Sequence, residues 1–138
     1  MLPNEVFLDT AFALALSVAS DEHHQKALLL ADELEAQNVR LVTTQAILFE
    51  IGNALAKLRY RQAAVDLLDA LENDPNVEIV VVSEVIYAQA FHLYRNRMDK
   101  EWGITDCISF VVMDEHRLTA ALTTDEHFQQ AGFQSLLR

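Results

Sequence analysis

The sequence has little of what would hold together a secreted or membrane-spanning chain. Its 138 residues include one cysteine, Cys107, so no disulfide can form within the chain. No apolar run approaches the roughly 18 residues that a membrane span requires. The first residues, MLPNEVFLDT, lack the positive start and cleavage-site pattern of a signal peptide. We therefore expect a cytoplasmic protein with no membrane partner.

Glycine and proline are also scarce. Only three glycines and two prolines interrupt the chain, which excludes flexible linkers and low-complexity segments. The length fits one domain, and a hydrophobic content of 51% is ample for a single buried core. We expect residues 1–138 to form that one domain.

Positively charged residues are scarce as well. The chain has 10 Lys and Arg against 21 Asp and Glu, which gives a net charge of -11. This balance argues against a broad basic face that holds nucleic acid. Phosphate contacts would have to be local, through bound metal ions or through two short clusters of cations. These clusters are Lys57, Arg59 and Arg61, and Arg95, Arg97 and Lys100. The alternative is that they complement helix dipoles in last helical turns.

Short apolar runs of strand length alternate with longer segments of helical periodicity. The runs are Val6–Leu8, Arg40–Thr43, Glu78–Val82 and Thr119–Leu122, with Phe133–Leu137 as a weaker candidate. Helices are expected after a cap at Asp21, over Gln45–Leu58, over about Arg61–Glu72, from a cap at Ser83 to about Tyr94, and over about Thr105–His116. This alternation predicts an α/β fold, with a mainly parallel central sheet covered by helices on each side.

Four carboxylates occupy unusual places in this pattern. Asp9 ends VFLD, Asp106 lies in WGITDCISF and Asp125 lies in ALTTDEHF, each where an apolar stretch meets a predicted helix start. Glu50 interrupts the apolar stripe of ILFEIGNAL. Ligands of parallel sheets gather at the carboxyl ends of the strands, and both Asp9 and Asp125 follow predicted strands. We expect the four acids to share one pocket.

Each acid also has a purely structural explanation. Asp9, Asp106 and Asp125 could cap helices or lie in first turns, where carboxylates accept backbone N–H bonds. Glu50 lies about a turn inside its helix, so capping does not account for it. A buried, unpartnered Glu is costly, although Glu50 could lie at the edge of the stripe and reach water.

A cluster of like charges is tolerated when a cation neutralises it or when protons are taken up. Oxygen ligands suit hard ions, so Mg2+ or Mn2+ is expected, as one or two ions. No His or Cys stands at a matching place in the sequence. His92, His116 and His127 are expected to be surface or capping residues, and the His23–His24 pair a solvated first helical turn. No nucleotide-binding glycine motif follows a strand.

Such a site favours phosphodiester hydrolysis, in which the metal neutralises charge on the phosphate and lowers the pKa of a water. One acid could serve as general base. Thr10, Thr105 and Thr124 each lie beside an acid, where their hydroxyls could orient a water or a carboxylate. Helix capping is an equally good role for them.

Four blocks of sequence resemble the PIN-domain family, and within it the VapC-like toxins of toxin-antitoxin pairs. They are FLDT with the apolar segment after it, EIGNAL, DKEWGITDCISFVVM and ALTTDEHFQQAGF, in the order of the family. The resemblance implies an α/β/α sandwich and a metal-dependent endonuclease of single-stranded RNA. It also implies a homodimer and a cognate antitoxin.

Carried over by position, the acidic quartet of the family is Asp9, Glu50, Asp106 and Asp125. Asp99 matches a further acidic position that could act in the outer shell, or could pair with Lys100 or be solvated. Trp102 is expected to pack beneath the site. The alternatives to a toxin are a solitary PIN-like nuclease in RNA processing, a non-catalytic interaction module, a phosphatase and a flap-type DNA nuclease.

Overall fold

A computed structural model describes residues 1–138, in which strands and helices alternate along the chain. The strands are β1 (Glu5–Leu8), β2 (Arg40–Thr44), β3 (Val77–Val80), β4 (Ala120–Leu122) and β5 (Gln134–Ser135). The helices are α1 (Thr10–Ser17), α2 (His24–Ala36), α3 (Gln45–Ala54), α4 (Leu58–Asn73), α5 (Glu84–Asn96), α6 (Ile104–Glu115) and α7 (Glu126–Gln130). All five predicted strands are present, and each end lies within two residues of its predicted position.

The strands form one sheet in the order β3-β2-β1-β4-β5, and every neighbouring pair is parallel. The first strand is central, with Phe7 opposite Val42 on one side and Ala121 on the other. The prediction of an α/β fold with a parallel sheet is confirmed. Parallel pairing brings the ends of β1 and β4, and the residues after them, to the same edge of the sheet.

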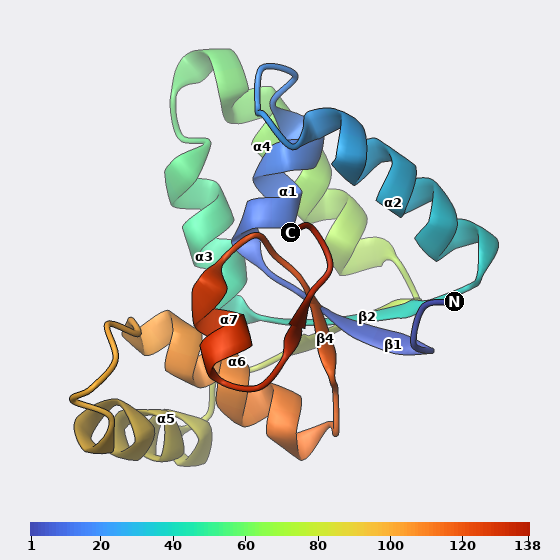
Figure 1. Ribbon diagram of the computed structural model, residues 1–138. Coiled ribbons are helices and arrows are strands. Elements are labelled where there is room, and N and C mark those ends of the chain that lie inside the picture. The colour runs from blue at the N-terminus through green and yellow to red at the C-terminus, as the bar shows by residue number, and fades with distance from the viewer.

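Helices cover both faces of the sheet, which accounts for strands that are apolar on both sides (Figure 1). Helices α1, α2 and α4 lie on one face and α6 on the other, with α5 packed on the outer side of α6. This is the three-layer arrangement that the alternation of elements predicts.

A group of aromatic side chains holds α6 and α7 against the central strand. The Phe128 ring, fully buried, lies 6.2 Å from Phe7 and meets the Phe110 ring edge-on at 5.0 Å. Trp102 also packs edge-on against Phe110, at 5.0 Å. Because Phe110 lies one turn after Asp106, this packing fixes where the start of α6 stands relative to β1.

Two predicted helix boundaries are wrong. The helix expected over Gln45–Leu58 ends at Ala54, and Leu58 begins α4 with its side chain 89% exposed. The chain turns between these residues although the apolar period continues through Leu58. Asp21 accepts a hydrogen bond from the His23 N–H at 2.8 Å, which closes a turn, but α2 itself begins at His24.

The first cation cluster does not lie in a last helical turn. Lys57 precedes α4 and Arg59 and Arg61 lie near its start, so the dipole explanation is wrong for these three. Arg95 does lie in the last turn of α5, as that explanation requires. No helix has both the length and the apolar character needed to cross a bilayer.

Candidate active site

An open cleft of about 670 Å3 lies at the carboxyl edge of the sheet. Asp9, Glu50, Asp106 and Asp125 all line it, together with Thr10 and Thr124. Four segments that are far apart in the sequence supply these acids: the end of β1, the middle of α3, the first turn of α6 and the residue before α7. Six of the eight residues singled out in the sequence therefore line one cleft, whereas Thr105 and Asp99 do not.

Asp9 forms the floor of the cleft, directly after the central strand. Its side chain occupies the position of an N-cap for α1 but makes no capping hydrogen bond, so helix capping does not explain it. The residue is 8% exposed. Burial raises the pKa of Asp9 to about 7, against hydrogen bonds from Thr123 and the Thr10 backbone that lower it, and nearby Glu50 and Asp106 raise it further. An ionised Asp9 therefore calls for a positive partner.

Thr123 is a site residue that the sequence analysis missed. Its hydroxyl donates to Asp9 Oδ2 at 2.7 Å and accepts the Asp125 N–H at 3.0 Å. The side chain is fully buried between the two acids. It lies two residues before Asp125 at the end of β4, where parallel pairing with β1 indicates a neighbour of Asp9.

Glu50 reaches the cleft from α3 and is exposed to water. Glu50 is therefore not a buried acid of the apolar stripe. Its side chain lies at the edge of that stripe and reaches water. The Thr10 hydroxyl donates to Glu50 Oε1 at 2.6 Å. Thr10 therefore ties the start of α1 to α3 and fixes one oxygen of this carboxylate.

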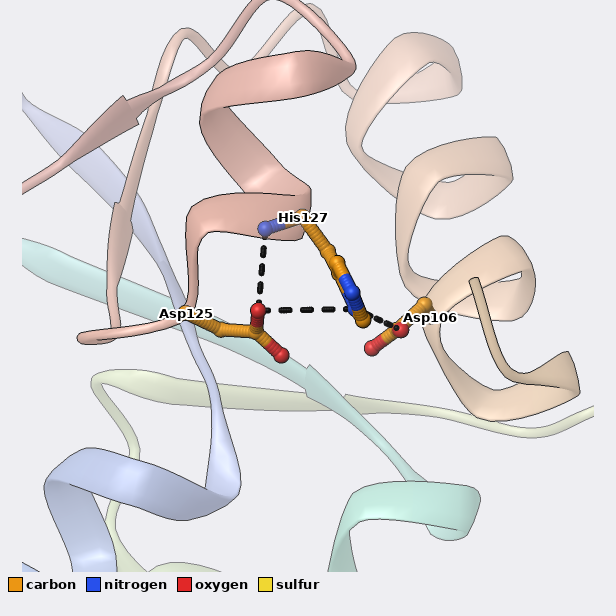
Figure 2. Close-up of side chains that lie close together, drawn as sticks. All are labelled: Asp106, Asp125 and His127. Carbon is orange, nitrogen blue, oxygen red and sulfur yellow. Dashed lines mark hydrogen bonds and ion pairs between the residues drawn. The ribbon is translucent and has the colours of Figure 1, made fainter. Parts of the chain in front are cut away.

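Asp106 and Asp125 approach each other through a histidine, as Figure 2 shows. His127 Nδ1 lies 2.9 Å from Asp106 Oδ2 and 3.4 Å from Asp125 Oδ1. Asp106 Oδ2 also accepts the Gly103 N–H at 3.1 Å, and Asp125 Oδ1 accepts the His127 N–H at 2.9 Å. Both acids thus accept backbone N–H bonds at the start of a helix, as the structural explanation requires. Both also line the cleft.

The expectation that no His stands near the acids is wrong. His127 lies in the first turn of α7, where its ring folds back toward Asp125 and across to α6. Partial burial lowers the pKa of His127, but the hydrogen bond to Asp106 and the charges of Asp125, Asp106 and Glu126 outweigh it and raise the pKa. The spacing Asp-x-His at a helix start could have indicated that His127 lies near Asp125. Its contact with Asp106, 21 residues earlier, depends on the fold.

Two other expected contributors lie outside the cleft. Asp99 accepts two hydrogen bonds from the Arg97 guanidinium, at 2.9 and 3.0 Å, and this partner lowers the pKa of Asp99 to about 2. It pairs with Arg97 and not with Lys100. The Thr105 carbonyl accepts the Ser109 hydroxyl at 3.0 Å, a contact within α6 and not with the cleft.

Trp102 is buried, as expected, and does not line the cleft. Its indole N–H donates to Gln130 at 3.0 Å, and the Arg97 guanidinium lies over its ring. These contacts connect the segment before α6 to α7. Trp102 therefore supports the position of Asp106 and is not a platform for a base.

The donor set fits a hard divalent cation. The four acids bring oxygen ligands to one cleft, and in Glu50, Asp106 and Asp125 an internal donor holds one oxygen while the other accepts no hydrogen bond from the protein. Single ligand atoms of Asp106, Asp125 and His127 lie within 4.8 Å of one another. Oxygen-rich sites of this kind favour Mg2+ or Mn2+.

Comparisons with known proteins agree with this geometry. The family model of the PIN domain matches residues 6–134. VapC20 of Mycobacterium tuberculosis, described as a Sarcin-Ricin loop cleaving toxin, is 27% identical and superposes with a TM-score of 0.81, over 93% of this chain and 95% of that chain. A search of curated proteins gives no significant match.

Two more distant structures share the fold. FitAcB of Neisseria gonorrhoeae is 21% identical, with a TM-score of 0.65 over 94% of this chain and 95% of that chain. VapBC2 of Rickettsia felis, solved with a DNA fragment from its promoter, is 15% identical, with a TM-score of 0.64 over 95% and 96%. Because the family match covers nearly the whole sequence, the chain belongs to the PIN domain family.

Proposed function

We propose that the protein is a Mg2+- or Mn2+-dependent endoribonuclease of single-stranded RNA and the toxin of a toxin-antitoxin pair. The observation that carries the proposal is that Asp9, Glu50, Asp106 and Asp125 line one cleft. Membership of the PIN domain family supports a nuclease. Similarity to VapC20, which is described as a Sarcin-Ricin loop cleaving toxin, supports the cleavage activity and the toxic role.

The acids have separable roles in this proposal. Asp9, Asp106 and Asp125 would hold one or two ions with their carboxylates. A bound ion of this kind neutralises charge on the phosphate and lowers the pKa of the attacking water. Glu50 is the only exposed member of the four, and Thr10 leaves its second oxygen without a protein partner. That oxygen is the best placed to accept the proton of the water.

A small group of cations supports a nucleic acid as the substrate. Lys57 and Arg59 are exposed at the start of α4, three and five residues after Ala54 in the cleft wall. A positive charge at a helix N-terminus opposes the helix dipole, so helix stability does not account for these residues. They offer phosphate contacts beside the cleft in a chain that is otherwise strongly acidic.

Cleavage assays on matched substrates test the proposal. With Mg2+ or Mn2+ the protein is expected to cut single-stranded RNA, and not single-stranded DNA of the same sequence or duplex RNA. Chelation with EDTA should stop the reaction, and restored Mn2+ should restart it, because the carboxylates alone lack a positive charge for the phosphate. Equal cleavage of DNA would favour a general nuclease, and no cleavage of any substrate would favour the interaction module.

A cognate antitoxin is the second part of the proposal. The cleft is lined by four acids, so a basic side chain of a protein partner could occupy it and exclude RNA. The free, buried Cys107 suits the reducing cytoplasm in which such a pair would act. A neighbouring reading frame for a small DNA-binding protein would favour the toxin. Its absence would favour a solitary nuclease.

We also propose that two copies associate through the outer face of α5. Tyr87, Phe91 and Tyr94 follow one another on this face, with ring centroids 6.1 and 6.3 Å apart and exposures of 50, 36 and 47%. The inner face of α5 packs against α6 through Ile86 and Ala90. The helix is therefore apolar on two faces, and an exposed aromatic patch of this kind marks an interface.

A second copy of the chain is the partner that the charges favour. Glu84 lies in the first turn and Arg95 in the last turn of the same helix. Helical spacing puts Glu84 on the face of Tyr87, and the Arg95 guanidinium lies 4.7 Å from the centre of the Phe91 ring. When two such helices pack antiparallel about a two-fold axis, the acid of each meets the base of the other.

Light scattering coupled to gel filtration tests this interface. The wild-type protein is expected to elute with twice the mass of the chain. Phe91→Glu should elute with the mass of one chain, because a carboxylate replaces the central aromatic ring of this face and pairs with Arg95 of its own helix, which is then withdrawn from Glu84 of the second copy. The matched control is Leu29→Glu, which changes a leucine that is 66% exposed on α2 and should leave the dimer intact. A dimeric Phe91→Glu variant would rule out this face.

A further inference from the structure

His127 joins two of the four acids from outside the cleft. Its Nδ1 contacts Asp106, at the start of α6, and Asp125, the residue before α7. Only 25% of the His127 side chain is exposed, against 20% for Asp106 and 37% for Asp125. One ring nitrogen therefore connects the carboxylates of two separate elements (Figure 2).

The ring does not line the cleft that the four acids share. It borders a separate polar hollow on its other side, with Lys100, Glu126 and Gln130 among the neighbours. Asp106 and Asp125 line the cleft, and His127 lies behind them. A group in this place is better situated to hold the carboxylates than to enter the cleft itself.

The bonds to Asp106 are made to one oxygen only. Oδ2 receives both the Gly103 N–H and His127 Nδ1, whereas Oδ1 accepts no hydrogen bond from the protein. In Asp125, Oδ1 receives the His127 N–H and lies 3.4 Å from the ring, and Oδ2 is left without a donor. The internal donors thus select which oxygen of each acid remains for a ligand.

We propose that His127 is a positioning residue whose Nδ1–H holds Asp106 and Asp125 together, so that the second oxygen of each is presented to a divalent cation. The inference rests on the proposed function, because it assigns the cation to the same cleft. Hydrogen bonds to ligating carboxylates orient them and strengthen metal binding. His127 also limits the repulsion between the two carboxylates before the cation arrives.

Ligation by the ring is the competing arrangement, since the Nδ1 atom and one oxygen of each acid are close enough to surround an ion. The two arrangements differ in where the Nδ1 proton goes. A positioning His keeps that proton when the ion binds, whereas a ligating nitrogen must lose it. They also differ in the preferred ion, because a nitrogen ligand favours Mn2+ over Mg2+.

Three variants separate these arrangements in metal titrations followed by calorimetry. His127→Leu removes the donor and should weaken Mg2+ binding by about 10- to 100-fold, with Mn2+ weakened to the same degree. His127→Asn places an amide N–H near the position of Nδ1 and should restore most of the affinity. His92→Leu, at an exposed histidine without a carboxylate contact, should bind like wild type. At saturating Mg2+ the kcat of His127→Leu should return toward the wild-type value.

Nitrogen-15 spectra of the wild-type ring give a second measurement that needs no variant. The Nδ1 proton is expected to persist when Mg2+ saturates the protein. Its loss on Mg2+ binding, a preferential loss of Mn2+ affinity in His127→Leu, or an Asn variant no better than Leu would each overturn the inference. Failure of the proposed function is distinguishable, because the wild-type protein would then bind no divalent cation in the same titrations.

Discussion

Asp106→Asn is expected to lower metal-dependent cleavage of single-stranded RNA by more than about 100-fold, because loss of a residue that merely orients a ligand already costs about 10- to 100-fold. The substitution removes a negative charge from the cleft and keeps the shape of the side chain. The amide oxygen can still accept the Gly103 N–H that closes the start of α6. The variant should therefore fold, and initial rates at a fixed Mg2+ concentration measure the loss.

Asp99→Asn is the control for this experiment. Asp99 lies in the segment that leads into α6, but it is paired with Arg97 and does not line the cleft. The cleavage rate of the Asp99→Asn protein should stay within a few-fold of the wild-type rate. An Asp106→Asn protein that cleaves as well as the Asp99→Asn protein would remove the acid quartet from the reaction. A large loss in Asp99→Asn would restore the outer-shell role expected of it.

Asp9→Asn is expected to stabilise the metal-free protein at about pH 8, by up to roughly 4 kcal/mol if the whole cost of ionising Asp9 is relieved. The folded state keeps the Asp9 proton up to about pH 7, whereas an ordinary Asp releases it near 3.8. The unfolding free energy therefore falls as the pH rises between these values and remains lowered above them. Asn carries no charge to desolvate and can still accept the Thr123 hydroxyl.

The gain should shrink as the pH falls below 7, because Asp9 is then protonated and neutral in the folded wild-type protein. Denaturant unfolding at about pH 5 and about pH 8, with EDTA present, measures the difference. Asp32→Asn, at an exposed position in the interior of α2, should show no such pH-dependent gain. An Asp9→Asn variant that is less stable than wild type at about pH 8 would contradict the burial of an unneutralised charge.

The sequence alone predicts the fold and much of the cleft for a simple physical reason. Buried parallel strands appear as short apolar runs, and ligand-binding residues follow such strands at one edge of the sheet. Asp9 after β1 and Asp125 after β4 are found in this way, as is the sheet itself. Glu50 is found in a different way, because it is a charged residue within the apolar stripe of a predicted helix.

The remaining parts of the site depend on contacts between distant residues. Thr123 meets Asp9 across 114 positions, and His127 meets Asp106 across 21. No local pattern encodes such pairs, since they arise from the strand order and from the packing of α6 against α7. Asp99 is the opposite case, a residue that was expected near the site and lies outside it. The sequence does not indicate that the Asp99 carboxylate forms an ion pair with Arg97.

The most direct test of the account is a divalent-metal titration of the purified protein followed by heat denaturation at neutral pH. Mg2+ or Mn2+ should raise the melting temperature of the wild-type protein, and the rise should continue with the logarithm of the ion concentration above the dissociation constant, because the ion binds only the folded site. Asp9→Ala should abolish that rise. A wild-type melting temperature that ignores both ions, or an equal rise in Asp9→Ala, would contradict a cation site formed by these carboxylates.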